Sequence, residues 1–340
     1  MKRLISNGYT ILTKLRHPAA NAISARGAHV TRIGSLAVLA ALFVSAVMAA
    51  MPVFADDPAP PSGSGSVVDQ GMAMFDDGKL LATGGVSDLE GAGGGGLATW
   101  ALTTGYGTRD GVGLDGHFTY IALPDYSLWT EGAAVGLWDR VELSYAHLTF
   151  DTEKVGATLG LGKDFEFDQD VVGVKVKVVG DAVYEQDSWI PQIAVGAQYK
   201  STDHVDILHA VGAKSGDGTD FYIAATKLFL AESLLVDVTL RETKANQFGI
   251  LGFGGDKNDN YSTEFEGSAA YLFSRQFAAG VELRTKPSNL SIAHEGEAWD
   301  LFAAYFLNKN LSLTVAYADL GNIVIKNDQH GAYLSLQAGL

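Results

Sequence analysis

The sequence predicts an all-β protein, an up-and-down antiparallel transmembrane β-barrel of about 14 strands, with 12 strands as the alternative. Three observations support this prediction: an N-terminal segment typical of export, many segments that alternate apolar and polar residues, and a last segment, 332–340, that alternates up to the final residue. After the N-terminal segment, no apolar run is long enough for a membrane-spanning helix. In a membrane the chain must therefore form a closed sheet, which satisfies every backbone polar group.

Residues 1–55 are predicted to be a cleaved signal peptide. They contain six Lys or Arg and no acid, and the uncharged run 33–55 ends in Val53-Phe54-Ala55, which fits a cleavage site. An uncleaved inner-membrane anchor is the alternative, since the run is just long enough to span a bilayer. Cleavage is favoured because no stop-transfer cluster of charges follows.

The composition beyond residue 55 excludes several classes of function. This part has 39 acids and 18 Lys or Arg, a net charge of −21, whereas nucleic-acid binding needs a basic surface. With no cysteine in the chain, there is no disulfide, thiolate metal site or lipid-anchored cysteine. No cofactor is predicted.

The rest of the chain divides into two parts. Residues 56–78 are rich in Pro, Gly, Ser and Asp and are predicted to form a flexible leader or a possible plug, and residues 79–340 form the barrel. A soluble β-sandwich would also alternate. The membrane is favoured because the strands reach ~9–11 residues and because Tyr and Trp recur near strand ends, as interfacial girdles require. These aromatic residues are Trp100, Tyr106, Tyr145, Trp189, Tyr199, Trp299, Tyr305 and Tyr317.

Connection lengths predict the sidedness of the barrel. Short turns are expected near 138–139, 231–232, 274–275 and 308–309, and long connections at 151–170, 201–219, 244–260, 287–295 and 321–329. An even number of strands separates successive short turns, so these turns and the C-terminus share one rim, the periplasmic one. Residues 96–106 and 113–123 are predicted strands joined by a short turn at 108–111, and the same parity requires one more strand near 79–86, which brings the total to 14.

Charged residues opposite the apolar faces are the candidate functional residues. Bases near the membrane midplane would cost ~2–4 kcal/mol each against lipid, so these side chains should face the lumen. Two interpretations remain open: the charges line a pore and set its selectivity, or they close the lumen with a salt-bridged network. The candidates are Lys175, Lys177, Asp237, Arg241, Glu264, Glu266, Glu282, Arg284, Lys286 and Asp300.

Three further features suggest chemistry only weakly. The glycine run at 91–96 has no following helix or Lys, so a phosphate loop is excluded and a flexible loop or a segment folded into the lumen is expected. His204, Asp206 and His209 could bind a metal, but they lie on an irregular loop, and no metal site is predicted. His147 is the one residue that suggests a hydrolase; with no Gly-x-Ser-x-Gly motif, a rim histidine is favoured and no enzyme is predicted.

Four stretches, 90–102, 247–256, 284–290 and 316–323, resemble an uncharacterised family of proteobacterial outer-membrane proteins that is known only as a domain of unknown function. The resemblance covers roughly residues 78–340 and implies an outer-membrane barrel, with no substrate assigned. Leu340 departs from the aromatic residue with which many such proteins end, which weakens the expected recognition by the barrel-assembly machinery.

The predicted function is a passive outer-membrane channel for small solutes, with a lumen of mixed charge. One alternative is a non-transporting structural or adhesive barrel whose acidic loops bind partners or divalent-bridged lipopolysaccharide. A hydrolase is the second alternative. The predicted location is the outer membrane of a Gram-negative cell, with membrane lipid, lipopolysaccharide and the barrel-assembly machinery as partners and the solute unidentified.

Overall fold

The computed structural model describes residues 78–84 and 86–340, which form a closed barrel of twelve strands. The predicted signal peptide and nearly all of the predicted leader lie outside the described residues. The barrel strands are β3 (Val112–Ala122), β4 (Ser127–Leu137), β5 (Val141–Asp151), β6 (Glu166–Val179), β7 (Gln192–Thr202), β8 (Asp217–Phe229), β9 (Leu234–Thr243), β10 (Ser262–Leu272), β11 (Phe277–Arg284), β12 (Ala298–Phe306), β13 (Leu311–Asp319) and β14 (His330–Gly339).

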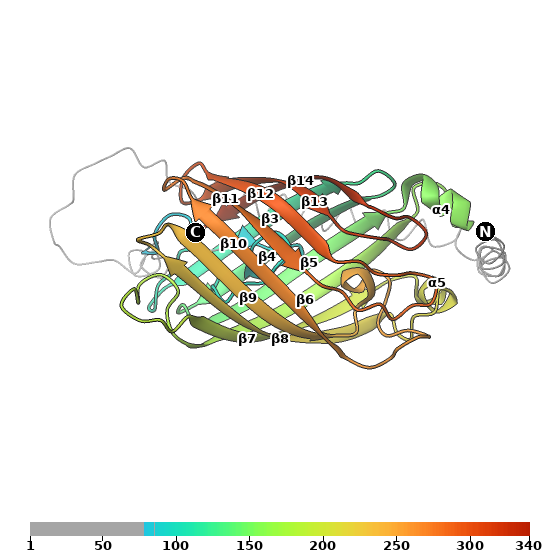
Figure 1. Cartoon of the computed structure of the whole chain (residues 1–340), viewed down its shortest axis with the longest axis horizontal. Coiled ribbons are helices and arrows are strands. Elements are labelled where there is room, and N and C mark those ends of the chain that lie inside the picture. The colour runs from blue at the N-terminus through green and yellow to red at the C-terminus, as the bar shows by residue number, and fades with distance from the viewer. Residues whose placement is uncertain (1–77, 85) are drawn as a thin grey trace, which may run out of the picture.

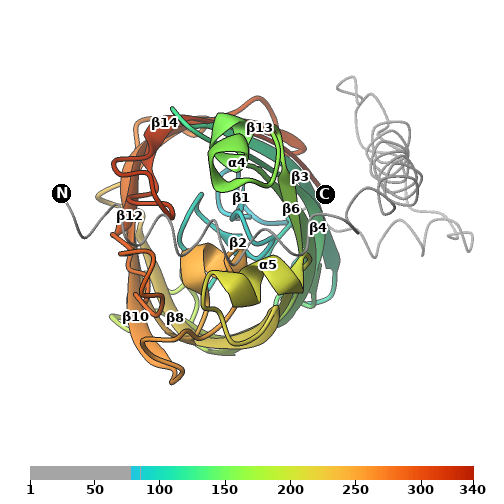
Figure 2. The same ribbon diagram turned by 90° about the vertical axis from the view of Figure 1, so that its right-hand side faces the viewer.

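Every strand pairs antiparallel with its neighbour in the sequence, and β14 closes the barrel by pairing with β3. The up-and-down architecture is therefore confirmed, and so is the alternative of twelve strands. Fourteen strands is wrong. Of the two predicted strands that are missing from the wall, residues 96–106 and the described residues 79–84 and 86 lie inside the barrel. Figure 2 shows the chain between β1 (Val86–Ser87) and β2 (Gly93–Gly94) surrounded by strands.

The sidedness predicted from connection lengths agrees with the structure. The five long connections carry α4 (Glu153–Leu159), α5 (Val205–Ala210) and η2 (Asn246–Gly249) and lie at the end of the barrel opposite the C-terminus (Figure 1). The four short turns lie at the C-terminal end. Two connections break the pattern, because 123–126 is a tight link at the long-loop rim and 180–191 is a long link at the short-turn rim.

The outer face of the barrel is apolar. Along β6, Val172, Val174 and Val176 are exposed while Lys175 and Lys177 are buried, as the alternation predicts. Trp189, Tyr199, Trp299, Tyr305 and Tyr317 are exposed aromatic residues, but Trp100 and Tyr106 are buried inside the barrel, so their place in a girdle was wrong. No helix among the described residues is long and apolar enough to cross a membrane.

This apolar face gives a first prediction about location. Val315 is exposed at the centre of β13, and we expect Val315→Arg to make folding into a bilayer less favourable by about 2–4 kcal/mol, because the guanidinium meets lipid near the midplane. Leu307→Arg, in the β12–β13 turn, should cost roughly 0–1 kcal/mol. Urea titrations in liposomes, with the folded fraction measured from gel mobility, compare the two; equal costs would contradict a transmembrane barrel.

Apolar side chains close the barrel beneath the long loops. Leu148, Phe150 and Phe167 on the wall pack with Phe248 and Leu251, which belong to or follow η2. Leu89 and Leu97 from the chain inside the barrel belong to the same cluster. The loop closure and the internal chain are therefore parts of one packed unit.

Candidate functional site

The candidate site is the lumen, and its main occupant is the chain itself. We call residues 79–84 and 86–106 the plug. Its backbone forms few ladder bonds, so wall side chains satisfy its N–H and C=O groups instead. In this way Ala101 donates to Thr226 Oγ1, and Thr239 and Gln192 donate to the carbonyls of Thr99 and Ala101.

Glu90 is the centre of the ion-pair network that fixes the plug. Its carboxylate contacts Lys200 Nζ from β7, lies 2.9 Å from Arg284 Nη2 on β11, and lies 3.9 Å from Arg241 Nη1 on β9. Glu266 pairs with Arg241 and, at 3.3 Å, with Arg284. Opposite charges this close, in a site closed to solvent, attract strongly enough to offset part of their desolvation.

A second clamp holds the plug against β5 and β6. Glu142 accepts hydrogen bonds from the N–H groups of Gly93 and Thr104, each at 2.8 Å. Lys175 Nζ lies 3.0 Å from Glu142 and donates to the carbonyls of Gly93 and Leu102 at 2.7 and 2.9 Å. One wall ion pair thus satisfies four backbone groups of the plug.

At the short-turn rim the start of the plug is held by Asp139. Lys79 and Lys177 lie 3.0 and 2.6 Å from this carboxylate, which also accepts a hydrogen bond from Thr103. Burial alone would raise the pKa of Asp139, but the two ammonium groups outweigh it and hold the pKa below its ordinary value. Because this pKa is lower in the folded state than in the unfolded state, Asp139 stabilises the fold at pH values above its unfolded-state pKa. This stabilisation is lost as the pH falls through the folded-state pKa.

This rim contact gives a second prediction. Asp139 has φ of +49° in the β4–β5 turn, a conformation that Asn also tolerates, so Asp139→Asn should keep the turn and remove only the charge. We expect faster amide exchange in residues 79–84 and unchanged exchange in 88–94, which the clamps at Glu90 and Glu142 hold. Hydrogen-exchange mass spectrometry measures both segments in one sample. Unchanged exchange in 79–84 would show that the carboxylate does not hold the start of the plug.

The structure places nine of the ten predicted lumen residues inside the barrel as buried side chains. Glu264 is half-buried near the long-loop rim and accepts a hydrogen bond from Thr285. Lys286 is just beyond β11 and pairs with Glu295 at 3.4 Å, beneath the loops. The nine buried residues are Lys175, Lys177, Asp237, Arg241, Glu266, Glu282, Arg284, Lys286 and Asp300.

Three residues of the ion pairs that hold the plug were not among the predicted lumen residues. The signal for Glu90 is its position directly before the glycine-rich stretch 91–96, which places its charge on the segment that enters the lumen. Lys200 alternates with Gln198 and Thr202, a signal as clear as that of Lys175. Glu142 is two residues into β5 and alternates with Ser144. Of the two structures expected for the glycine run at 91–96, a flexible loop or a segment folded into the lumen, the second is the one observed.

His147 faces outward on β5 near the long-loop rim. Its Nδ1 lies 2.9 Å from Asp170 and its Nε2 3.8 Å from Asp168, so both ring nitrogens face carboxylates. A nucleophile–histidine pair requires a hydroxyl or thiol against the ring, and the contacts of this ring within the described chain are to carboxylates instead.

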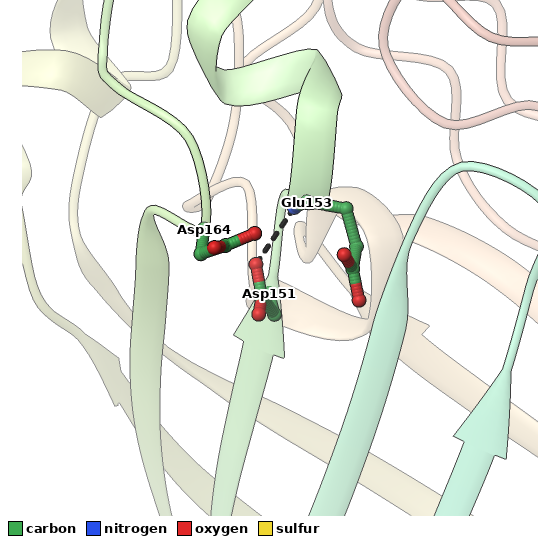
Figure 3. Close-up of side chains that lie close together, drawn as sticks. All are labelled: Asp151, Glu153 and Asp164. Carbon is green, nitrogen blue, oxygen red and sulfur yellow. Dashed lines mark hydrogen bonds between the residues drawn. The ribbon is translucent and has the colours of Figure 1, made fainter.

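The metal candidates do not come together. The ring of His204 packs at a tilt against Phe165, and His209 Nδ1 contacts the carbonyl of Ala213 at 3.1 Å. In residues 78–84 and 86–340, the three acids that lie close enough to share an ion are Asp151, Glu153 and Asp164, whose carboxylate oxygens lie within 4.8 Å of one another at the start of α4 (Figure 3). This cluster is largely solvent-exposed, and Asp151 already accepts a hydrogen bond from the Glu153 N–H.

Comparisons with solved structures find outer-membrane proteins at low sequence identity. It is 12% identical to the KdgM porin, covering 66% of this chain and 98% of that one with a TM-score of 0.43. It is 8% identical to Omp33 of Acinetobacter baumannii, covering 67% of this chain and 97% of that one with a TM-score of 0.40. It is 9% identical to outer membrane phospholipase A of Escherichia coli, covering 66% of this chain and 95% of that one with a TM-score of 0.38.

No curated protein matches the sequence. The model of a family described as "Protein of unknown function (DUF3034)" matches residues 83–337, which include nearly all of the plug and the whole barrel wall up to the last strand. The chain therefore belongs to the DUF3034 family.

Proposed function

We propose that this protein is an outer-membrane channel for small solutes that its own plug holds closed. The observation that carries the proposal is that a separate stretch of chain, rather than the wall side chains, fills much of the lumen. Barrels of about eight strands are filled by their own side chains, and wider ones enclose cavities or channels. A twelve-stranded wall therefore encloses a bore that would open if the plug left it.

The nature of the contacts supports a plug that can be displaced. The plug is held largely by hydrogen bonds and ion pairs to wall side chains, and water can replace such contacts when the plug moves. Leu89 and Leu97 connect the plug to the apolar cluster under the long loops, so its departure would also weaken the loop closure. An outer-membrane location is supported by the apolar outer face and the exposed aromatic residues.

Deletion of the plug tests the proposal directly. A variant without residues 79–104 should fold, as judged by heat-modifiable gel mobility, and show large steady conductance in planar bilayers, while the full chain shows a closed baseline with brief openings. A folded deletion variant without conductance would overturn the channel. Deletion of residues 56–77, which precede the plug, is nearly as long and controls for shortening of the chain.

A non-transporting structural barrel is the second candidate, and one observation favours it. The described lumen is filled by the plug and by ion pairs such as Glu142–Lys175 and Glu266–Arg241, which also rigidify the wall. This candidate predicts that plug deletion lowers the unfolding temperature but leaves solute flux into liposomes unchanged.

A further inference from the structure

The lumen holds an excess of buried carboxyls over bases. Lys175, Lys200, Arg241 and Arg284 each pair with an acid. Five buried acids in the described part of the barrel and plug form no ion pair and instead contact hydroxyls, backbone N–H groups or nothing. They are Asp88, Asp115, Asp237, Glu282 and Asp300.

Two of these acids lie directly opposite each other. Glu282 on β11 and Asp300 on β12 are register partners, which puts their Cβ atoms roughly 4.5–5.5 Å apart on the inner face. Glu282 is satisfied, because it accepts hydrogen bonds from Gly96 N, Leu97 N and Ser268 Oγ, each at 2.7 Å. Asp300 is 1% exposed, and neither of its oxygens accepts a hydrogen bond. Two ionised carboxylates buried side by side are costly unless a proton or a cation neutralises part of their charge.

The described part of the plug forms no hydrogen bond or ion pair with β12, which carries Asp300, or with its neighbour β13. The hydrogen bonds and ion pairs between the described plug residues and the strands reach β3 to β11 and β14, and none ends on β12 or β13. A mostly apolar cavity of about 40 Å³, room for about three waters, lies between Trp100 and the wall residues Phe302 and Thr314, and neither acid of the pair lines it. Thr314 Oγ1 is buried without a hydrogen-bond partner, a second orphaned polar group along the same wall.

Two plug glycines connect the cavity to the acid pair. Gly95 and Gly96 line its end. A Cβ on Gly95 would overlap Glu282 Oε1, and a Cβ on Gly96 would lie 3.3 Å from Asp300 Oδ2 and 3.2 Å from the Tyr333 hydroxyl. The glycine turn thus brings the plug backbone against both carboxyls: a side chain at Gly95 would collide with Glu282, and one at Gly96 would crowd Asp300.

From the orphaned Asp300, its register partner Glu282 and the glycine turn packed against both, we infer that the closed lumen binds a small inorganic cation at the Glu282–Asp300 pair. Carboxylate oxygens and hydroxyls are the ligands that hard cations take. The inference deepens the proposed channel function, since the lumen of the opened channel would then favour cations over anions.

Cation-dependent stability of the full-length protein tests the inference without requiring conductance. The unfolding temperature is measured at equal ionic strength in CaCl₂, KCl and tetrabutylammonium chloride, whose cation is too large for the site. We expect Ca²⁺ or K⁺ to stabilise the wild type. In Asp300→Asn the same stabilisation should need about tenfold more cation or worse, because a charged ligand is gone. In tetrabutylammonium chloride, Asp300→Asn should be at least as stable as the wild type, because repulsion has been removed.

Two further variants separate the site from other acids. Gly96→Ala keeps both charges but places a methyl group against Asp300 and should also weaken the cation response. Glu153→Gln removes one carboxyl of the exposed cluster at α4 and should leave the lumen-dependent response intact. A wild type that responds identically to all three salts, or an Asp300→Asn variant that keeps the full response, overturns the inference. A cation response without conductance in the plug-deleted barrel would leave the site standing and remove the channel.

Discussion

Glu90→Gln should open the barrel. The substitution keeps the size of the side chain but removes the charge that Lys200, Arg241 and Arg284 share, so that only Asp220 and Glu266 remain as their acidic partners. Removal of one member of a buried ion-pair network costs about 3–5 kcal/mol, because the remaining charges stay buried without compensation. This cost falls on the docked state of the plug alone, so the undocked state becomes more populated.

Planar-bilayer recording measures the outcome as a higher open probability for Glu90→Gln than for the wild type, together with a lower unfolding temperature. Glu131→Gln is the matched control, because Glu131 lies on the outer face of β4, opposite His147, and does not contact the plug. A folded Glu90→Gln variant that conducts no more than the wild type would show that the ion pairs at Glu90 do not keep the lumen closed.

Wall strands could be predicted from the sequence because each has one lipid-facing side. The period-two alternation of Val172, Val174 and Val176 against Lys175 and Lys177 is imposed by two solvents of opposite polarity, and it sets the register and facing of β6. Connection lengths then fixed the sidedness, because polar loops of different length lie at the two rims.

The plug could not be distinguished from wall strands for the same physical reason. Residues 96–106 alternate apolar and small or polar groups because one side meets charged wall residues and the other meets Leu235, Ala270 and Phe302, which imitates a strand between lumen and lipid. Only the partners differ: Thr99 N donates to Glu266 and Ala101 N to Thr226 instead of to a neighbouring backbone. Such long-range pairings leave no local signature in the sequence.

The sequence predicted which wall residues face the lumen, but it did not predict what they bind there. Alternation placed Arg241, Glu266 and Arg284 inside, yet it gave no indication that Glu90, some 150–190 positions earlier in the chain, would join them. The choice between an open pore and a closed network depended on that missing partner, because charges that would line a bore instead bind the plug.

A disulfide between plug and wall should close the channel completely and reversibly. Ser87 Oγ donates to Asp115 Oδ2 at 2.6 Å, and since the chain has no cysteine, Ser87→Cys with Asp115→Cys introduces a single possible bridge. In the Glu90→Gln background, we expect oxidation to abolish the added conductance and dithiothreitol to restore it. Ser87→Cys alone controls for the thiol. If the oxidised triple variant conducts as well as the reduced one, solutes pass without movement of the plug, and the gate must lie in the loops above Leu89 and Leu97 instead.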